Sequence, residues 1–542
     1  GQAAPMTDFS RRAALRALAA LGVVPGTLRA AGADGKVVPV RDGIAPVRHD
    51  ALTRLSLSDR LLARFSFPPT SAPVLGPDKK GGGHRLLWRL AFEGRAAGNH
   101  GDLYDNRDRD HSRLPPEAHP QLAHTRYDAA TREANLDYAV ATRMLFDAPT
   151  IGNASLANVG AALWRSLPRE ALTTPGAVAR MWRTYTSGAL YVFPEHRDHD
   201  PEHGDLLPAN TPYYLMSQGS SGSDQPHLEA LAMILAAVRP DTKAALKDAG
   251  LIAPTLQMIY RRGRSGTGSR AGYLSGLAHV SVFGWKQINL AAMVGAANAL
   301  MPDGIPPLVR LVVESETRAE QGVDFFGAGL TEALFDTPSA IARVWRAAAY
   351  SREMVISAAG TRDPNGRPLR FTWALLHGDP ARTRITPLDP VGRRARIEVD
   401  WQDPRPEAGR PEIRVPRIDI GVFAENGAAL SAPAFVSILL PAHERRVYER
   451  GPDGEMRPAM IDRHRDAARY ADPLIFPETP WRDVYAYDAR GRPSGWTRHH
   501  PDGGQARYAA DGRRLGGGGA GGVYYRIHAR PDGSREVRPF HG

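Results

Sequence analysis

The stretch Tyr191–Glu229 reads YVFPEHRDHDPEHGDLLPANTPYYLMSQGSSGSDQPHLE and gathers imidazole, carboxylate and hydroxyl groups in one window. Gly, Pro and Asn interrupt it so often that neither a helical nor a strand period survives. The stretch then runs into HLEALAMILAAV, which has the apolar pattern of a buried helix. We therefore predict a polar loop that leads into a buried helix, a setting in which functional groups are commonly held.

Imidazoles and carboxylates alternate in the first half of this stretch. Neutral imidazoles and carboxylates suit Zn²⁺, Mn²⁺ or Fe²⁺, and a further carboxylate often orients a ligating His. We predict that His196, His199 and His203 hold a divalent metal or supply a general base, while Asp198 or Asp205 orients them as part of the catalytic group. The spacing of the three His matches no standard zinc signature, so a hydrated acidic loop is the alternative.

The second half of the stretch, QGSSGSDQP, precedes a helix that begins near Pro226. Because a helix N-terminus presents free N–H groups and a positive dipole end, we predict an anion-binding role for Ser220, Ser221 and Ser223. The alternative is a simple helix cap, in which Ser223 or Asp224 bonds to the first turn. The G-x-S-x-G elbow of esterases is absent from these residues.

A second polar cluster, Asn99–Ser112, reads NHGDLYDNRDRDHS. We expect it to lie against residues 195–229 and to form one cleft with them. In that cleft His111 or Asp110 would act as acid or base from the opposite side. The alternating Asp and Arg could instead neutralise one another on the surface, and their spacing is not that of an EF-hand.

The length and composition of the chain limit its domain number, its partners and its metal ligands. A chain of 542 residues is too long for one compact core, so two to four domains are expected. The net charge of +11 comes from Arg spread along the chain without a recognised nucleic-acid module, so it does not indicate a nucleic-acid partner. The chain has no Cys, which excludes disulfides, thiolate metal sites and cysteine nucleophiles. Any metal must therefore be held by His and oxygen ligands.

Residues 1–33 contain, in order, a charged pair, a short apolar run and a small-residue triplet. The pair is Arg11-Arg12, the run extends from Ala17 to Leu28, and the triplet ends at Ala33. This order resembles a twin-arginine export signal, which implies a periplasmic or secreted protein exported in the folded state. The alternative is an amphipathic helix of the mature protein. The apolar run is too short to span a bilayer, and no other segment approaches that length.

We predict an irregular lead-in at residues 34–84 and a mainly helical domain at residues 85–351. Thr174-Pro175 and Thr337-Pro338 both place a capping hydroxyl before a Pro at the first helical position. The apolar spacing predicts helices at 134–146, 156–166, 175–190, 226–238, 242–248, 253–261, 286–300 and 338–351.

From Met354 the pattern changes to a period of two, which predicts strands around an Asp-Pro-Asn-Gly turn. SAAGTRDPNGRPLRFTW and IDIGVFAENGAALSAPAFVSILL resemble the strands of a PKD domain, and the resemblance covers residues 352–442. It implies an immunoglobulin-like sandwich, with Trp373 buried, that spaces or presents a neighbouring domain. After Trp373 the family's glycine-rich motif is replaced by ALLHGDP, so no ligand is implied.

Residues 443–542 are rich in Gly, Pro and Tyr. Residues 487–492, YDARGR, recur as YAADGR at 508–513. This resembles the YD repeat of Rhs-type surface proteins. Two copies are too few for a stable repeat array, so we predict a short β-meander.

The predicted fold is therefore a mainly α N-terminal domain, then an all-β immunoglobulin-like sandwich and a small β-rich tail. The predicted function is an exported hydrolase, with a divalent metal as its one candidate cofactor, that acts on a polymeric or cell-surface substrate. The alternative is a non-catalytic protein that binds glycan or protein at the cell surface or in the periplasm. Neither the substrate nor the oligomeric state follows from the sequence.

Overall fold

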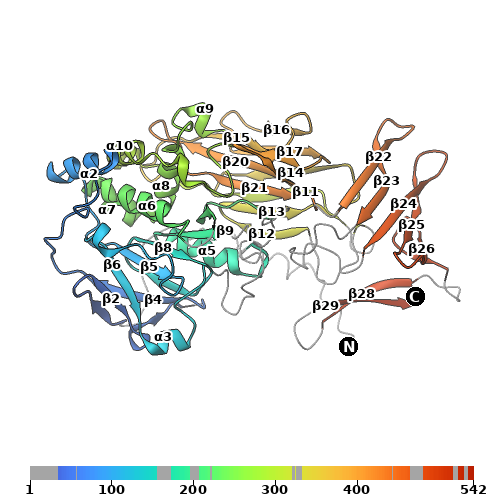
Figure 1. Cartoon of the computed structure of the whole chain (residues 1–542). Helices are drawn as coiled ribbons and strands as arrows, with labels where there is room; N and C mark the ends of the chain where they lie inside the picture. Colours follow the sequence, from blue (N-terminus) through green and yellow to red (C-terminus); the bar gives the residue numbers. More distant parts are fainter. Residues whose placement is uncertain are drawn as a thin grey trace, which may run out of the picture.

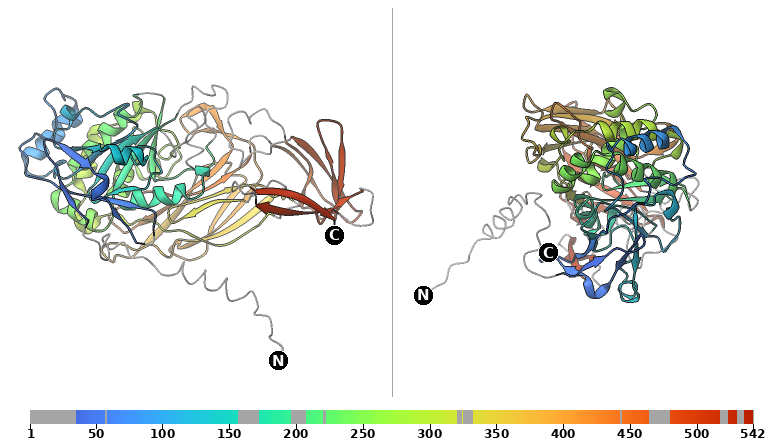
Figure 2. Two further views of the ribbon diagram at one scale, coloured as in Figure 1. Left: turned by 90° about the horizontal axis from the view of Figure 1, so that it is seen from below. Right: turned by 90° about the vertical axis from the view of Figure 1, so that its left-hand side faces the viewer.

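The computed structural model describes residues 35–56, 58–155, 172–195, 207–219, 222–319, 324, 332–441, 444–463, 480–516, 523–529 and 535–541. Helices make up 21% of it and strands 36%, with parallel sheets of the α/β type, so the predicted mainly α N-terminal domain is wrong. The chain instead forms an α/β body, a pair of packed β-sheets and a terminal antiparallel sheet, arranged from one end of an elongated molecule to the other (Figures 1 and 2).

The α/β body is built on a six-stranded sheet in which every neighbouring pair is parallel. Its spatial order is β10 (Tyr214–Gln218), β9 (Ala189–Glu195), β8 (Thr150–Ala154), β5 (Leu103–Arg107), β6 (Ala123–Tyr127) and β2 (Ile44–Val47). Strand β8 is buried at every position, as expected for a parallel strand covered on both faces.

Helices cover one face of this sheet (Figure 1). They are α2 (Gly82–Phe92), α6 (Gln225–Ala237), α7 (Pro240–Asp248), α8 (Ile252–Arg262) and α10 (Leu290–Ala299). Helix α5 (Ala177–Thr186) lies on the opposite side of the sheet, where Arg60 donates to the carbonyl of Arg180 (3.1 Å) and to Thr184 Oγ1 (2.8 Å) (Figure 1). The five predicted helices at 175–190, 226–238, 242–248, 253–261 and 286–300 are confirmed within a few residues at their ends. Helix α6 is buried on almost all sides and occupies the centre of the largest apolar core.

A small sheet covers the other face of β2, β5 and β6. It contains β1 (Val37–Pro39), β3 (Thr53–Arg54), β4 (Leu61–Ser66) and β7 (Met144–Phe146). Side chains such as Phe65 and Phe146 from this sheet share a core with Val47 and Leu103 of the larger one.

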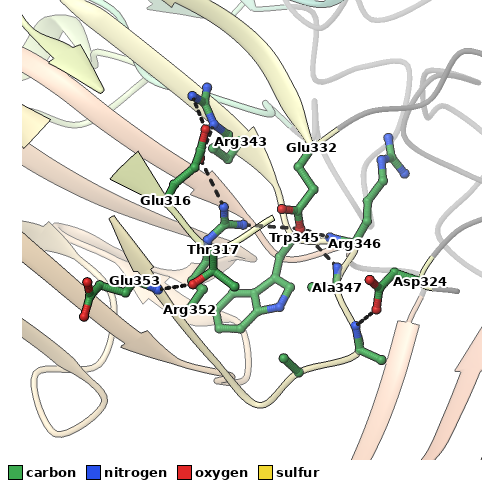
Figure 3. A network of polar contacts seen from close by, with 12 residues as sticks. Glu316, Thr317, Asp324, Glu332, Arg343, Trp345, Arg346, Ala347, Arg352 and Glu353 are labelled. Atoms are coloured by element: carbon green, nitrogen blue, oxygen red, sulfur yellow. Dashed lines mark hydrogen bonds and ion pairs between the residues drawn. The ribbon is translucent and has the colours of Figure 1, made fainter. Parts of the chain in front are cut away.

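Two predicted helices are strands or irregular chain. Residues 134–146 form turns that end in strand β7, and residues 338–351 contain strand β13 (Ala340–Val344). Strand β13 is buried at every position, so apolar residues do not alternate with polar ones along it. Such a continuous run also fits the apolar spacing of a buried helix, which is why a helix was predicted. Polar contacts hold the chain on either side of it (Figure 3). Glu332 Oε1 accepts hydrogen bonds from the backbone N–H groups of Arg346 (2.8 Å) and Ala347 (3.0 Å).

Two further sheets pack face to face. The first contains β11 (Val312–Glu316), β14 (Ser351–Ser357), β17 (Arg394–Asp400) and β16 (Thr383–Pro387). The second contains β12 (Ala333–Thr337), β13, β21 (Ala434–Leu439), β20 (Arg417–Glu425) and β15 (Arg370–His377). Three of these strands precede residue 352, so a boundary at that residue would separate them from the sheets to which they are paired.

The central strands of the second sheet, β13, β20 and β21, are buried on both faces. Ile341, Ile420 and Val436 point into the core between the two sheets. Phe423 and Phe435 belong instead to the core of the α/β body. Since β20 and β21 therefore contact apolar groups on either side, they lack the alternation of a half-buried strand.

Trp373 is only partly buried, and its indole N–H donates to the carbonyl of Gly392 at 2.8 Å. The fully buried indole of these packed sheets is that of Trp345, at 0% exposure, which contacts Trp401 edge to face with ring centroids 5.6 Å apart. Trp373 therefore lacks the full burial predicted for it, and the fully buried indole is that of Trp345, in a segment that the sequence predicted to be helical.

The terminal sheet has eight antiparallel strands in chain order. They are β22 (Glu444–Arg450), β23 (Met456–Arg463), β24 (Trp481–Tyr487), β25 (Pro493–His499), β26 (Gln505–Tyr508), β27 (Arg514–Leu515), β28 (Val523–Ala529) and β29 (Arg535–His541). The same turn recurs four times, with positive φ at Gly454, Gly491, Gly503 and Gly512. The two repeats visible in the sequence are therefore part of a set of four similar hairpin turns.

Among the residues described here, none of the helices is both long enough and apolar enough to cross a membrane.

Candidate functional site at the carboxyl edge of the parallel sheet

The topology of the parallel sheet singles out the ends of β5 and β8. The chain leaves β5 for β6 on one side, whereas it leaves β8 for β9 on the other. Neighbouring strands whose connections diverge in this way leave a crevice at their carboxyl ends, where ligands of open α/β sheets bind. The residues at these ends are Asn106 and Asn153.

Asn153 is the centre of a buried hydrogen-bonded chain at this edge. The hydroxyl of Tyr104 donates to Asn153 Oδ1 at 2.7 Å. Asn153 Nδ2 donates to Asp224 Oδ2 at 2.8 Å and to the carbonyl of His111 at 3.2 Å. One amide thus connects β5, β8, the loop after β5 and the start of α6.

The loop after β5 holds an unusual backbone. Arg109, Asp110 and Ser112 have φ values of 49°, 66° and 49°, a left-handed region that residues other than Gly rarely adopt. Asn106 supports this shape, because its Oδ1 accepts from the backbone N–H groups of Asp108 (2.9 Å) and Asp110 (3.0 Å). Such strain persists only where surrounding contacts impose it, and it is concentrated at functional sites.

The two polar segments meet at this edge. The backbone N–H of Gly222 donates to Ser112 Oγ at 2.7 Å, and Gln225 Nε2 donates to the carbonyl of Arg113 at 3.2 Å. The expected contact between residues 99–112 and 195–229 is therefore confirmed for the loop before α6.

Only some of the predicted site residues lie at this carboxyl edge of the sheet within the described part of the chain. His111 is exposed and contributes its carbonyl, whereas the exposed Asp110 lines a cavity. Ser223 Oγ is 3.0 Å from Ser217 Oγ, and the next residue, Asp224, puts a carboxylate at the start of α6. The rest of the predicted group, His196, Asp198, His199, His203, Asp205, Ser220 and Ser221, lies outside the described residues.

No set of three or more His, Asp or Glu side chains within the described ranges is arranged to hold a metal ion. The metal-binding role of His196, His199 and His203 stays a prediction.

A cavity of about 440 Å³ opens beside β5, β6 and β2. Its charged lining residues are Arg109, Arg113, Arg126, Arg132, Asp110 and Asp137. Its floor includes Tyr104 and His124, which are directly paired on adjacent strands with ring centroids 4.9 Å apart. The loop of residues 108–115 contributes one wall, so the strained backbone shapes the cavity directly.

Two buried polar atoms at the cavity lack a partner among the described residues. They are His124 Nε2 and Asp137 Oδ1, on side chains that are 7% and 9% exposed. Burial, reinforced by the nearby Arg113, lowers the pKa of His124 to about 4, so its ring is neutral at physiological pH. Buried polar groups are nearly always hydrogen-bonded, so this pair at the cavity is available to a water molecule or to a ligand.

The sequence reading did not identify His124, Arg126 or Asp137. His124 and Arg126 lie in AHTRY, whose polar residues mask a buried parallel strand, and Asp137 follows a short helix, α3 (Ala129–Glu133). The sequence holds one local signal for them: side chains alternate along a strand, so His124 and Arg126, two residues apart in β6, lie on the same face.

Asp105 and Arg107, also near the end of β5, form a buried ion pair on the opposite face of the parallel sheet. Asp105 Oδ2 accepts from Arg107 Nε (2.7 Å) and Tyr191 OH (2.6 Å), and Oδ1 accepts from Thr125 Oγ1 (2.6 Å) and Tyr127 OH (2.9 Å). Both charged side chains are fully buried, so neither faces a ligand.

The ionisation of Asp224 should couple this edge to pH. Burial raises the pKa of Asp224 to about 6, against the lowering effect of hydrogen bonds that include the one from Asn153. Because the pKa of Asp224 in the folded protein lies above the ordinary 3.8, the protonated side chain stabilises the folded state. This stabilisation is fully present below pH 3.8 and is lost as the pH rises through about 6.

We therefore expect Asp224→Asn, which cannot ionise, to be more stable than the parent by about 3 kcal/mol near pH 8 and nearly equally stable near pH 4. Urea unfolding at both pH values measures this difference. Asp248→Asn, on the exposed end of α7, is the matched control and should change neither value. A stability difference for Asp224→Asn that is the same at both pH values would contradict the coupling.

The scan against protein-family models finds no match, and neither does the search of curated proteins. Among solved structures, one neighbour is a nucleoside hydrolase-related hypothetical protein from Saccharophagus degradans that is associated with carbohydrate metabolism. It shares 11% identity over 54% of this chain and 71% of its own, with a TM-score of 0.20. A likeness at that score assigns neither a fold nor an activity to this chain.

Proposed function

We propose that this protein is an exported hydrolase that cleaves a glycosidic bond in a polymeric or cell-surface carbohydrate bound in the cavity beside β5 and β6. The observation that carries this proposal is the presence of two carboxylates, Asp110 and Asp137, on the walls of one cavity at the carboxyl edge of a parallel sheet. Most glycoside hydrolases use a pair of carboxyl groups, one as acid and one as base or nucleophile.

The positions of the two carboxylates suggest their roles. Asp110 lies on the exposed, strained loop, where water reaches it, so it is assigned to take a proton from the attacking water. Asp137, in the buried wall, is assigned to protonate the leaving oxygen. In this step the water oxygen bonds to the anomeric carbon and the glycosidic C–O bond breaks. The water gives one proton to Asp110, and Asp137 gives one proton to the leaving oxygen.

The unpartnered atoms of the cavity favour a sugar. Asp137 Oδ1 can accept a hydrogen bond from a hydroxyl, and His124 Nε2 can exchange one with another hydroxyl. A sugar ring presents several hydroxyls that can meet both atoms at once. Export is part of the proposal and rests on the resemblance of Arg11-Arg12 and the run after it to a twin-arginine signal.

The second candidate is a non-catalytic glycan-binding protein. It is favoured by the arginines of the cavity, which can hold a ligand without any chemical step. It predicts binding without the release of new chain ends.

The test is release of reducing ends from a panel of polysaccharides by the purified full chain. We expect activity on at least one polymer, and we expect Asp137→Asn or Asp110→Asn to reduce its rate about 10²-fold while binding persists. Asp248→Asn is the matched control and should retain full activity. Binding without release by the parent protein would favour the second candidate, and full activity in both site variants would refute the assignment of the two carboxylates.

A further inference from the structure

The cavity carries more positive than negative charge. Four arginines line it against two aspartates, and His124 adds no charge because its pKa is lowered to about 4. None of Arg109, Arg113, Arg126 and Arg132 forms an ion pair or a guanidinium hydrogen bond with any residue that the structure describes. A group of cations with free donors beside a concave surface is a recognition site for a negatively charged group.

The four arginines come from different elements. Arg126 projects from β6 on the same face as His124, and Arg132 lies in the last turn of α3. Arg109 and Arg113 belong to the loop after β5, where the guanidinium of Arg109 stacks 4.4 Å from the ring centre of Tyr138. This stacking and the strained backbone of the loop restrict where the Arg109 guanidinium lies.

We propose that the ligand of this cavity is an acidic sugar, with its anionic group among the arginines and a hydroxyl donating to Asp137 Oδ1. The arginines require an acceptor of negative charge, whereas Asp137 Oδ1 requires a hydroxyl donor, which a bare anion does not supply. Only a ligand that carries both groups satisfies the two walls. The anionic group is a carboxylate, a sulfate ester or a phosphate ester, which share this chemistry.

The proposal deepens the proposed function, because it names the substrate class of the same cavity, although the binding it describes needs no catalysis. An uncharged glycan would leave four guanidinium groups unpaired beside it. A free inorganic anion would leave Asp137 Oδ1 and His124 Nε2 without partners. The acidic sugar is therefore expected to bind more tightly than either.

The test is calorimetric titration of the full chain with an oligogalacturonate and with its fully methyl-esterified, neutral form. We expect the acidic form to bind at least about tenfold more tightly at low salt, with the advantage shrinking as ionic strength rises and screens the exposed charges. A sulfated oligosaccharide, a phosphorylated oligosaccharide and inorganic sulfate are the further arms, which distinguish the three anionic groups and the free anion.

Arg126→Ala and Arg113→Ala should each remove most of the preference for the acidic form while leaving the melting temperature unchanged, since both side chains are exposed. Arg507→Ala, on an exposed position of the terminal sheet, is the matched control and should keep the preference. Equal binding of acidic and neutral forms, a preference for inorganic sulfate over every acidic sugar, or no binding in any arm would each overturn the proposal.

Failure of this proposal is separable from failure of the proposed function. Tight binding of an acidic sugar that is never cleaved would leave the substrate class standing and refute the hydrolase. Cleavage of a neutral glycan without a preference for acidic ones would do the reverse. Asp137→Asn, which keeps the arginines, should still prefer the acidic form even where turnover has fallen.

Discussion

Asp105→Ala is expected to lower the free energy of unfolding by about 3–5 kcal/mol, the cost of leaving a buried charge without its partner. The four donors that converge on Asp105 come from β5, β6 and β9, so one carboxylate joins three strands of the parallel sheet. Without it, the guanidinium of Arg107 stays buried and keeps the carbonyl of Met144, to which Nη2 donates at 3.3 Å, and the ring of Tyr191, 4.2 Å from the ring centre, but has lost its carboxylate partner.

Urea unfolding followed by far-ultraviolet circular dichroism measures this loss. The matched control is Glu398→Ala, which removes the partner of Arg384 in an ion pair of 3.0 Å on the surface. Exposed pairs contribute at most about 1 kcal/mol, so the control should be nearly silent. If both variants lose the same amount, or if Asp105→Ala loses less than about 1 kcal/mol, the pair does not hold the strands together.

Trp345→Ala is expected to cost about 3–5 kcal/mol, because it opens a large void between two packed sheets. The indole is fully buried beside Trp401, and Arg352 lies 5.6 Å from its ring centre (Figure 3). The void cannot fill easily, because Ile341 and Ile438 of the same core belong to strands that are paired on both sides.

Thermal unfolding of the variant is the measurement, with Trp285→Ala as the matched control. Trp285 is 56% exposed, so its removal takes few buried contacts away. We expect a large fall in melting temperature for Trp345→Ala and little change for Trp285→Ala. The reverse order would mean that the core of the packed sheets lies elsewhere.

Local pattern was sufficient for elements whose signal is contained in neighbouring residues. Helices α6 and α8 were predicted within a few residues, because their apolar period and their starts and stops are local. The strands after Met354 were predicted for the same reason, since a strand such as β17 alternates between buried and more exposed positions. Cysteine chemistry was excluded by composition alone.

Local pattern failed where burial is complete on both sides. Strand β5, LYDNR, carries an Asp, an Asn and an Arg that look like loop residues, yet Asp105 and Arg107 neutralise each other inside the fold. Strand β13 was predicted as a helix, because it is buried at every position and one of its two pairing partners, β21, lies nearly a hundred residues further along the chain. A period of apolar residues cannot reveal such a partner.

The sequence by itself determined five of the six longer helices described in the α/β body, all but α2, together with the strands with one exposed face and the polar character of the two segments that meet at the sheet's edge. Only the tertiary structure decided that these segments belong to one sheet of six parallel strands, that its connections diverge at β5 and β8, and that a cavity forms beside β5, β6 and β2. The cavity draws Arg113 from a loop, Arg126 from a strand and Asp137 from beyond a helix. Their convergence depends on strand order, which is set by burial and hydrogen bonding across the whole sheet and leaves no trace in the spacing of neighbouring residues.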